Sequence, residues 1–209
     1  MGVVIAIDGP AGSGKSTIAK AVAAHLGFEY LDTGAMYRAV TFAVLARQVD
    51  PLDVNSVAGV ARDLKIDLGP PVMVDGMDAS AAIRGPEVTS LVSAVAAQPE
   101  VRAEMVRRQR ELVTDMAGVV VEGRDITTVV FPDAAVKVYL TASHEERAGR
   151  RARQDAEPDT GAVGVNLARR DRIDSTRAAS PLRVADSAVV IDTTGVTIDE
   201  VVEQVLALL

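Results

Sequence analysis

The chain has 209 residues, 48% of them hydrophobic, and a net charge of −7. That length and apolar content suffice for one domain with a substantial core. The acidic balance argues against binding nucleic acid or a membrane surface by general electrostatic attraction. The lack of Cys and the presence of only two His exclude disulfides and thiolate sites and argue against a histidine-based zinc centre. We find no signal peptide or membrane-spanning pattern, and we expect a cytoplasmic protein that works as a monomer.

A glycine-rich segment near the start has the strongest pattern in the sequence. The apolar run Val3–Ile7 predicts a strand buried on both faces. Gly9–Thr17 then fits G-x-x-x-x-G-K-[ST], and helical periodicity follows to about Leu26. This order of strand, loop and helix is the context of a phosphate-binding loop. There, backbone N–H groups converge on phosphate oxygens that a Cβ would keep away. A merely flexible glycine-rich turn is the alternative.

The chemistry of this loop predicts a nucleoside triphosphate as ligand. Lys15 would reach the β- and γ-phosphates, and the Ser16 hydroxyl group would bind Mg²⁺. The motif does not indicate which molecule accepts the phosphoryl group. The candidate ATP-binding residues are Gly9, Pro10, Ala11, Gly12, Ser13, Gly14, Lys15, Ser16 and Thr17.

Strands and helices alternate along the rest of the chain, which predicts an α/β fold with a five-stranded parallel sheet covered on both faces. Further strands are predicted at Phe28–Leu31, Val119–Glu122, Ala135–Leu140 and Ser187–Ile191. Helices are predicted at about 54–64, 87–97, 100–116 and 165–179, from the end of Asp32–Arg38 to about 47, from 143 into an arginine-rich stretch, and from 198 to the end. Alternating apolar residues at about 65–83 predict a small antiparallel sheet. Pro158 and two glycines predict a mobile loop at Gln154–Gly164.

Three polar clusters lie where an open α/β sheet places its ligands, beyond the carboxyl ends of strands. They are Asp32–Arg38, Gly123–Asp125 and Arg170–Arg177. Each has a structural alternative. The first could be a helix cap with a solvated Arg38, the second a turn with a local ion pair, and the third an exposed helix face with i,i+4 ion pairs.

Four sequence strings together resemble one family. IDGPAGSGKST, LDTGAMYRA, EGRDITTVVFPDA and RDRIDSTR, in this order, are similar to bacterial cytidylate kinases, which phosphorylate CMP and dCMP with ATP and Mg²⁺ in pyrimidine nucleotide metabolism. The resemblance covers nearly the whole chain. It implies one P-loop kinase domain over 1–209, with a monophosphate-binding insertion at about 33–100, which includes the small sheet, and a short lid at about 147–170.

The resemblance also implies roles for individual residues. Thr33, Tyr37 and Arg38 would line the CMP side, with Arg38 near its phosphate. Ser93, Arg102 and Asp125 match positions that contact cytosine. Arg170 and Asp174 match the pair that holds the pentose hydroxyl groups. The residues assigned to phosphoryl transfer are Lys15, Arg124, Arg147, Arg151 and Arg177, of which Arg147 and Arg151 belong to the lid.

Two departures from the family pattern concern the lid and the metal. The Gln154–Gly164 loop is compact and acidic for a lid. Glu122 stands at the end of its strand where a Walker-B-type Asp is expected, with Asp125 beyond it. The ligands of Mg²⁺ other than Ser16 therefore stay open.

The expected mechanism is alignment of two substrates among cations, with water excluded. A CMP phosphate is already anionic, so no strong general base is needed. Two alternatives remain open. One is a P-loop kinase for another monophosphate or for a small alcohol, for which Asp32 could act as the base. The other is a nucleotide-dependent switch without transfer activity.

Overall fold

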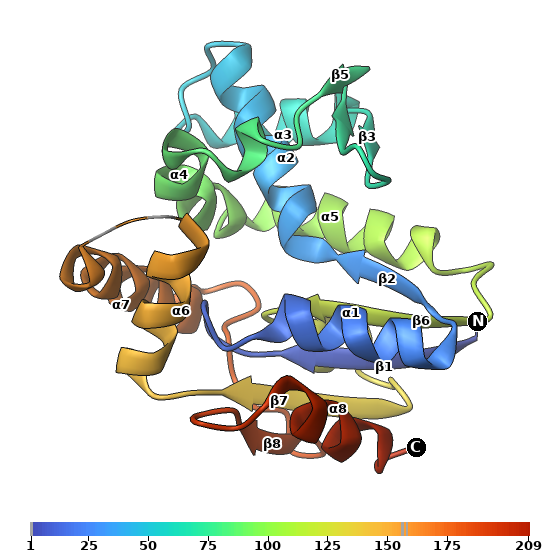
Figure 1. The fold of residues 1–209 in the computed structure, drawn as a ribbon. Coiled ribbons are helices and arrows are strands. Elements are labelled where there is room, and N and C mark those ends of the chain that lie inside the picture. Colours follow the sequence, from blue (N-terminus) through green and yellow to red (C-terminus); the bar gives the residue numbers. More distant parts are fainter. Residues whose placement is uncertain (1, 156, 158) are drawn as a thin grey trace. The chain divides into compact units, whose positions relative to one another are not determined.

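The computed structural model describes residues 2–155, 157 and 159–209, and its internal packing divides the chain into two compact units (Figure 1). The first unit consists of Met1–Leu31 and Val113–Leu209, and the second of Asp32–Leu112.

A five-stranded sheet forms the centre of the first unit, in the order β2-β6-β1-β7-β8. β1 pairs in parallel with β6 and β7, and β7 pairs in parallel with β8. The central strands are continuous apolar runs because both of their faces are covered. This confirms the predicted fold class and all five predicted strands. Their bounds are β1 Val3–Asp8, β2 Glu29–Asp32, β6 Gly118–Gly123, β7 Val136–Thr141 and β8 Val189–Asp192.

The helices of the first unit cover the sheet and its carboxyl edge. Figure 1 shows α1 and α8 on the same face, where both pack into one apolar core with β1 and β7. α6 and α7 pack against each other beyond the ends of the strands. A capping box opens α8, in which Thr197 and Glu200 satisfy each other's backbone N–H groups. The bounds are α1 Lys15–Leu26, α6 His144–Asp155, α7 Thr160–Thr176 and α8 Ile198–Leu206, with a π-helical turn, η2, at Ile126–Val130.

The second unit is helical, with its own apolar core and a small sheet. Asp32 and Asp53 cap two of its helices by accepting from Ala35 and Ser56 N–H groups. The predicted antiparallel sheet is confirmed as β3-β4-β5, and each of its strands is two residues long. The bounds are α2 Thr33–Ala46, α3 Val54–Asp63, β3 Ile66–Asp67, β4 Met73–Val74, β5 Met77–Asp78, the 3₁₀ turn η1 Ala82–Arg84, α4 Pro86–Ala96 and α5 Pro99–Leu112.

The predicted loop at Gln154–Gly164 is wrong over much of its length, although its residues 156 and 158 lie outside the described part of the chain. α6 continues to Asp155, and α7 already begins at Thr160. Asp159 caps α7 by accepting from the Ala162 N–H group. Gly164 has a packing role, because a Cβ there would lie 3.1 Å from Nε2 of His144 in α6. The glycine therefore lies inside a helix and faces a side chain of the neighbouring helix, where a loop glycine was predicted.

Gly118 at the start of β6 should tolerate no side chain. A Cβ there would lie 2.5 Å from the ring of Phe28, so we expect Gly118→Ala to lower the free energy of unfolding by about 1–3 kcal/mol. Gly59→Ala is the matched control, because Gly59 lies within α3 with no atom within 4 Å of the added Cβ. Alanine there should stabilise the protein by about 0.5–1 kcal/mol. Urea denaturation of both variants measures the difference, and equal effects would contradict the predicted clash.

Candidate active site

The glycines of the loop between β1 and α1 are required by close backbone contacts. A Cβ on Gly9 would lie 2.1 Å from the Leu140 carbonyl oxygen, and one on Gly12 would lie 2.8 Å from that of Arg147. Gly14 is the N-cap of α1 and has a φ of 90°, which a residue with a side chain rarely adopts. The loop therefore leads directly into a helix N-terminus, whose N–H groups and dipole favour an anion.

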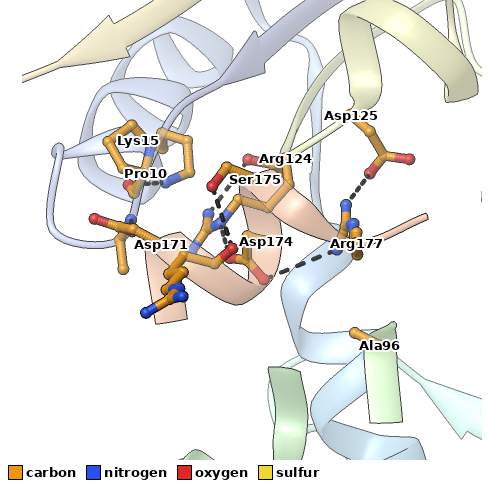
Figure 2. Close-up of polar contacts among 12 residues, drawn as sticks. Pro10, Lys15, Ala96, Arg124, Asp125, Asp171, Asp174, Ser175 and Arg177 are labelled. Atoms are coloured by element: carbon orange, nitrogen blue, oxygen red, sulfur yellow. Dashed lines mark hydrogen bonds and ion pairs between the residues drawn. The ribbon is translucent and has the colours of Figure 1, made fainter. Parts of the chain in front are cut away.

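Lys15 lies buried at the start of α1, and its Nζ donates to the Pro10 carbonyl oxygen at 2.8 Å (Figure 2). Burial and the nearby positive charge of Arg124 lower the pKa of Lys15 to about 7, although the carboxylates of Glu122 and Asp8 oppose this shift. A cation of this kind gains from an arriving negative charge, which would replace the water that burial has removed.

Arg124 follows β6 and pairs with a buried acid of α7. Its Nε lies 2.9 Å from Oδ2 of Asp174, a residue 50 positions further along the chain. Burial alone would lower the pKa of Arg124, but the carboxylates of Asp174, Asp171 and Glu122 raise it. The ion pair therefore joins two segments that are distant in sequence, unlike the local ion pair that was the alternative for Gly123–Asp125.

A second buried pair joins the same two segments. Nη2 of Arg177 lies 3.5 Å from Oδ1 of Asp125, and Nη1 lies 3.9 Å from Oδ1 of Asp174 (Figure 2). Both Arg177 and Asp174 are buried, so the exposed helix face that was the alternative for this cluster is wrong at these two positions. The segment after β6 and the end of α7 form one network of charged side chains.

Two buried polar atoms of the first unit have no hydrogen-bond partner among the residues that the structure describes. They are Nε of Arg170 and Oγ of Ser13 in the loop. Burial and the charge of Arg124 lower the pKa of Arg170 to about 10. Buried polar groups in proteins are normally satisfied, so these two donors fit a ligand that supplies acceptor oxygens. Together with Lys15 they match the phosphate chain of a nucleotide.

Two residues outside the loop form hydrogen bonds to the backbone of Ala11. Its carbonyl oxygen accepts from Nη1 of Arg147 at 3.1 Å, and its N–H group donates to Oδ1 of Asp171 at 3.3 Å. Arg147 and Asp171 also form an ion pair, so we call these three residues the loop bracket. The sequence prediction placed Arg147 among the lid arginines of phosphoryl transfer. The structure buries the Arg147 guanidinium against the loop backbone. Arg151, the other predicted lid arginine, is partly exposed, and its Nη1 lies 3.4 Å from Oε1 of Gln154.

Sequence reasoning missed two residues of the site. Asp8 ends β1 fully buried and accepts three hydrogen bonds from Ile126 and Thr127, while burial raises the pKa of its carboxyl group. An acid that ends an apolar strand was the available signal. Thr193 is buried beside the loop, with its hydroxyl oxygen 3.2 Å from the Ser13 carbonyl oxygen, and it accepts two hydrogen bonds from Arg150. Nothing in the sequence indicated that Thr193 contacts the loop.

The second unit carries the remaining predicted residues, all of them buried. Nη1 of Arg38 donates to the Ile83 carbonyl oxygen at 3.0 Å and to Oγ1 of Thr89 at 2.9 Å, so the solvated Arg38 of the alternative is wrong. The guanidinium of Arg102 lies 5.3 Å from the centre of the Tyr37 ring. The predicted residues in this unit are Thr33, Tyr37, Arg38, Ser93 and Arg102.

Two kinds of site are not found in the described part of the chain. Within residues 2–155, 157 and 159–209, no helix is long and apolar enough to cross a membrane. The same residues contain no group of three or more His, Cys, Asp or Glu side chains arranged to hold a metal ion.

The strand, glycine-rich loop and helix, with a buried lysine at the head of a parallel sheet, define the class of P-loop nucleotide-binding proteins. The family model for cytidylate kinase matches residues 5–209, and the chain belongs to the cytidylate kinase family. It is 49% identical to a cytidylate kinase of Streptomyces avermitilis, covering 99% of this chain and 92% of that one. It is 50% identical to one of Corynebacterium efficiens, covering 99% and 94%. A solved gluconokinase from Sinorhizobium meliloti shares the fold, with a TM-score of 0.53, 14% identity and coverage of 99% and 90%.

Proposed function

We propose that this protein transfers the γ-phosphoryl group of ATP to CMP and dCMP. The observation that carries the proposal is the set of buried and partly buried cations around the phosphate-binding loop, in a chain of the cytidylate kinase family. The charges of Arg124 and Arg170 both lower the pKa of Lys15, and the charge of Arg124 lowers that of Arg170, so the three cations lie near one another. Phosphoryl transfer spreads negative charge over the transferred group, and convergent cations stabilise it in a site that excludes water.

Mg²⁺ would be held with the nucleotide at Ser16. This serine is exposed in the first turn of α1, so its hydroxyl group is available to the ion. When bound, Mg²⁺ neutralises charge on the phosphate oxygens. Glu122 accepts from the Tyr30 hydroxyl group at 2.6 Å at the end of β6, which fixes a carboxylate near Lys15. This residue would orient waters around the ion, because Mg²⁺ in nucleotide sites keeps several waters.

Roles in binding CMP are proposed for residues of each unit separately. In the first, Asp174 and Arg170 would hold the pentose, Arg124 and Arg177 the phosphates, and Asp125 the base. In the second, the insertion at about 33–100 would contribute its buried polar residues. The assignment of 147–170 as a lid stays a prediction. The residues proposed for the second unit are Thr33, Tyr37, Arg38, Ser93 and Arg102.

An acceptor panel tests the proposed function. ADP release is measured with ATP and, in turn, CMP, dCMP, UMP, AMP, GMP and shikimate. We expect the highest kcat/KM values with CMP and dCMP. A preference for shikimate or a purine monophosphate would replace the proposed function by that of another P-loop kinase. ATP binding without acceptor-dependent ADP release would indicate a nucleotide switch.

Two broader properties are proposed with this function. A cytoplasmic location follows from the substrates, because ATP and CMP are cytoplasmic metabolites. We also propose a monomer, which light scattering after size-exclusion chromatography would test; a mass near 44 kDa, about twice the 21.9 kDa of the chain, would contradict it.

ATP binding should take up a proton through Lys15. With a pKa of about 7 the free amine is largely neutral near pH 8, and the phosphate charges should restore its proton. Calorimetric titration in buffers of different ionisation enthalpy should show close to one proton taken up near pH 8, where ATP itself is fully ionised. Lys15→Met, which has no ionisable group at this position, is the control. Equal uptake by wild type and this variant would assign the proton to another group.

A further inference from the structure

We propose that Asp8 is the positioning residue that fixes the segment Arg124–Thr127 relative to the phosphate-binding loop. The inference rests on the proposed function, because that segment carries Arg124 and Asp125, which are proposed to bind CMP. Asp8 is not among the residues that the loop motif or the family resemblance assigned.

The backbone of Asp8 is held on both sides. In the sheet it lies opposite Gly123 of β6 and Tyr139 of β7. The next residue, Gly9, opens the loop so close to β7 that a Cβ there would lie 2.1 Å from the Leu140 carbonyl oxygen. The backbone of Asp8, which carries this carboxylate, therefore cannot shift unless the sheet or the loop moves with it.

Both carboxylate oxygens of Asp8 accept hydrogen bonds from two consecutive residues, Ile126 and Thr127. Oδ1 accepts from the Ile126 N–H group at 2.9 Å. Oδ2 accepts from the N–H and hydroxyl groups of Thr127 at 2.8 and 2.6 Å. Because Asp8 and Thr127 are almost fully buried, water cannot replace these bonds at low cost.

The segment between these anchors carries the functional side chains. Gly123 is fixed by the strand ladder, and Ile126 and Thr127 are fixed by Asp8. Arg124 and Asp125 lie between the two anchors, and from there they pair with α7. Asp8 thus links β1, which leads into the phosphate-binding loop, to the two residues that are proposed to bind CMP.

Asp8→Asn tests this role with an unchanged side-chain shape. Each carboxylate oxygen accepts from one backbone N–H group, so either orientation of the amide turns its NH₂ group toward an N–H donor. We expect kcat/KM for CMP to fall roughly a hundredfold, because small misplacements of positioning groups have effects of that size. The Kd of a non-hydrolysable ATP analogue should change less than about threefold near pH 6, where Lys15 is largely protonated, because the loop keeps its own contacts.

Hydrogen exchange gives a readout independent of activity. Peptides covering Arg124–Val130 should exchange faster in Asp8→Asn, while those of α1 and β7 stay protected as in wild type. This readout decides the anchoring role even if the acceptor panel shows that CMP is not the substrate. Unchanged exchange over Arg124–Val130 in the folded variant would overturn the proposal.

A second variant keeps the test decisive if Asp8→Asn does not fold. Thr127→Val removes one of the three donors and keeps the shape, so it should lower kcat/KM for CMP in the same direction but less. Asp53→Asn is the matched control, because the exposed carboxylate of Asp53 also accepts from the N–H and hydroxyl groups of one residue, Ser56. Wild-type kcat/KM for CMP in whichever of Asp8→Asn and Thr127→Val folds, or equal losses in ATP affinity and CMP turnover, would contradict a positioning role.

Discussion

Lys15→Ala should lower kcat by at least about a thousandfold, which is the range for losing one cation that stabilises a transferring phosphoryl group. Lys15 is buried where the loop ends and α1 begins, and its pKa is lowered because water has been removed from the amine. The phosphoryl group becomes its counter-charge during transfer. The fold should survive, because a desolvated amine adds little stability and its hydrogen bond to Pro10 is local.

Steady-state turnover and thermal unfolding measure the two halves of this prediction. Lys137→Ala is the control, since Lys137 is a lysine of the same unit whose hydrogen bond to Ser187 is exposed. It should keep wild-type turnover. Wild-type turnover by a folded Lys15→Ala protein would remove the loop from the active site.

Asp125→Asn should reduce activity with CMP and narrow the preference for CMP over UMP. The exocyclic amine of cytosine is a donor at the position where uracil has a carbonyl group. An ionised Asp125 can only accept, so it matches cytosine and opposes uracil. We expect wild type to prefer CMP over UMP by about tenfold to several hundredfold in kcat/KM. An asparagine side chain can offer a donor to uracil, and the ratio should fall.

The structure supplies the competing explanation for Asp125. Its carboxylate is buried 3.5 Å from Arg177, so its loss could act by releasing that arginine. In that case CMP and UMP would weaken alike, and an unchanged CMP-to-UMP ratio would remove Asp125 from the base site. Asp133→Asn, an exposed acid of the same connection, is the control and should leave the ratio at the wild-type value. ATP affinity should change little in both variants.

The features that could be predicted are those that local sequence determines. The P-loop is one continuous segment, and its strand, glycines and helix each have a local signature. The caps at Asp53 and Thr197 are likewise contained within a few residues. These signals suffice for the five strands and for most helix bounds.

The features that could not be predicted depend on contacts between distant segments. Asp8 meets Ile126 from 118 positions away, and Arg147 meets Ala11 from 136. An arginine in an arginine-rich helix has the same local pattern whether it is solvated or buried. Gly164 was misread for a related reason, because a glycine that admits a neighbouring helix resembles one that loosens a loop.

The loop bracket restricts which sequences this phosphate loop can adopt. The motif leaves the position of Ala11 open to any residue, but its methyl group packs among Ala148, Ala152, Val163 and Leu167. Both backbone polar groups of Ala11 are also engaged, by Arg147 and Asp171. A larger residue would act as a wedge between the loop and the two helices. Natural variation at position 11 should therefore be narrow wherever α6 and α7 are kept, and a library randomised at this codon should return mainly small side chains.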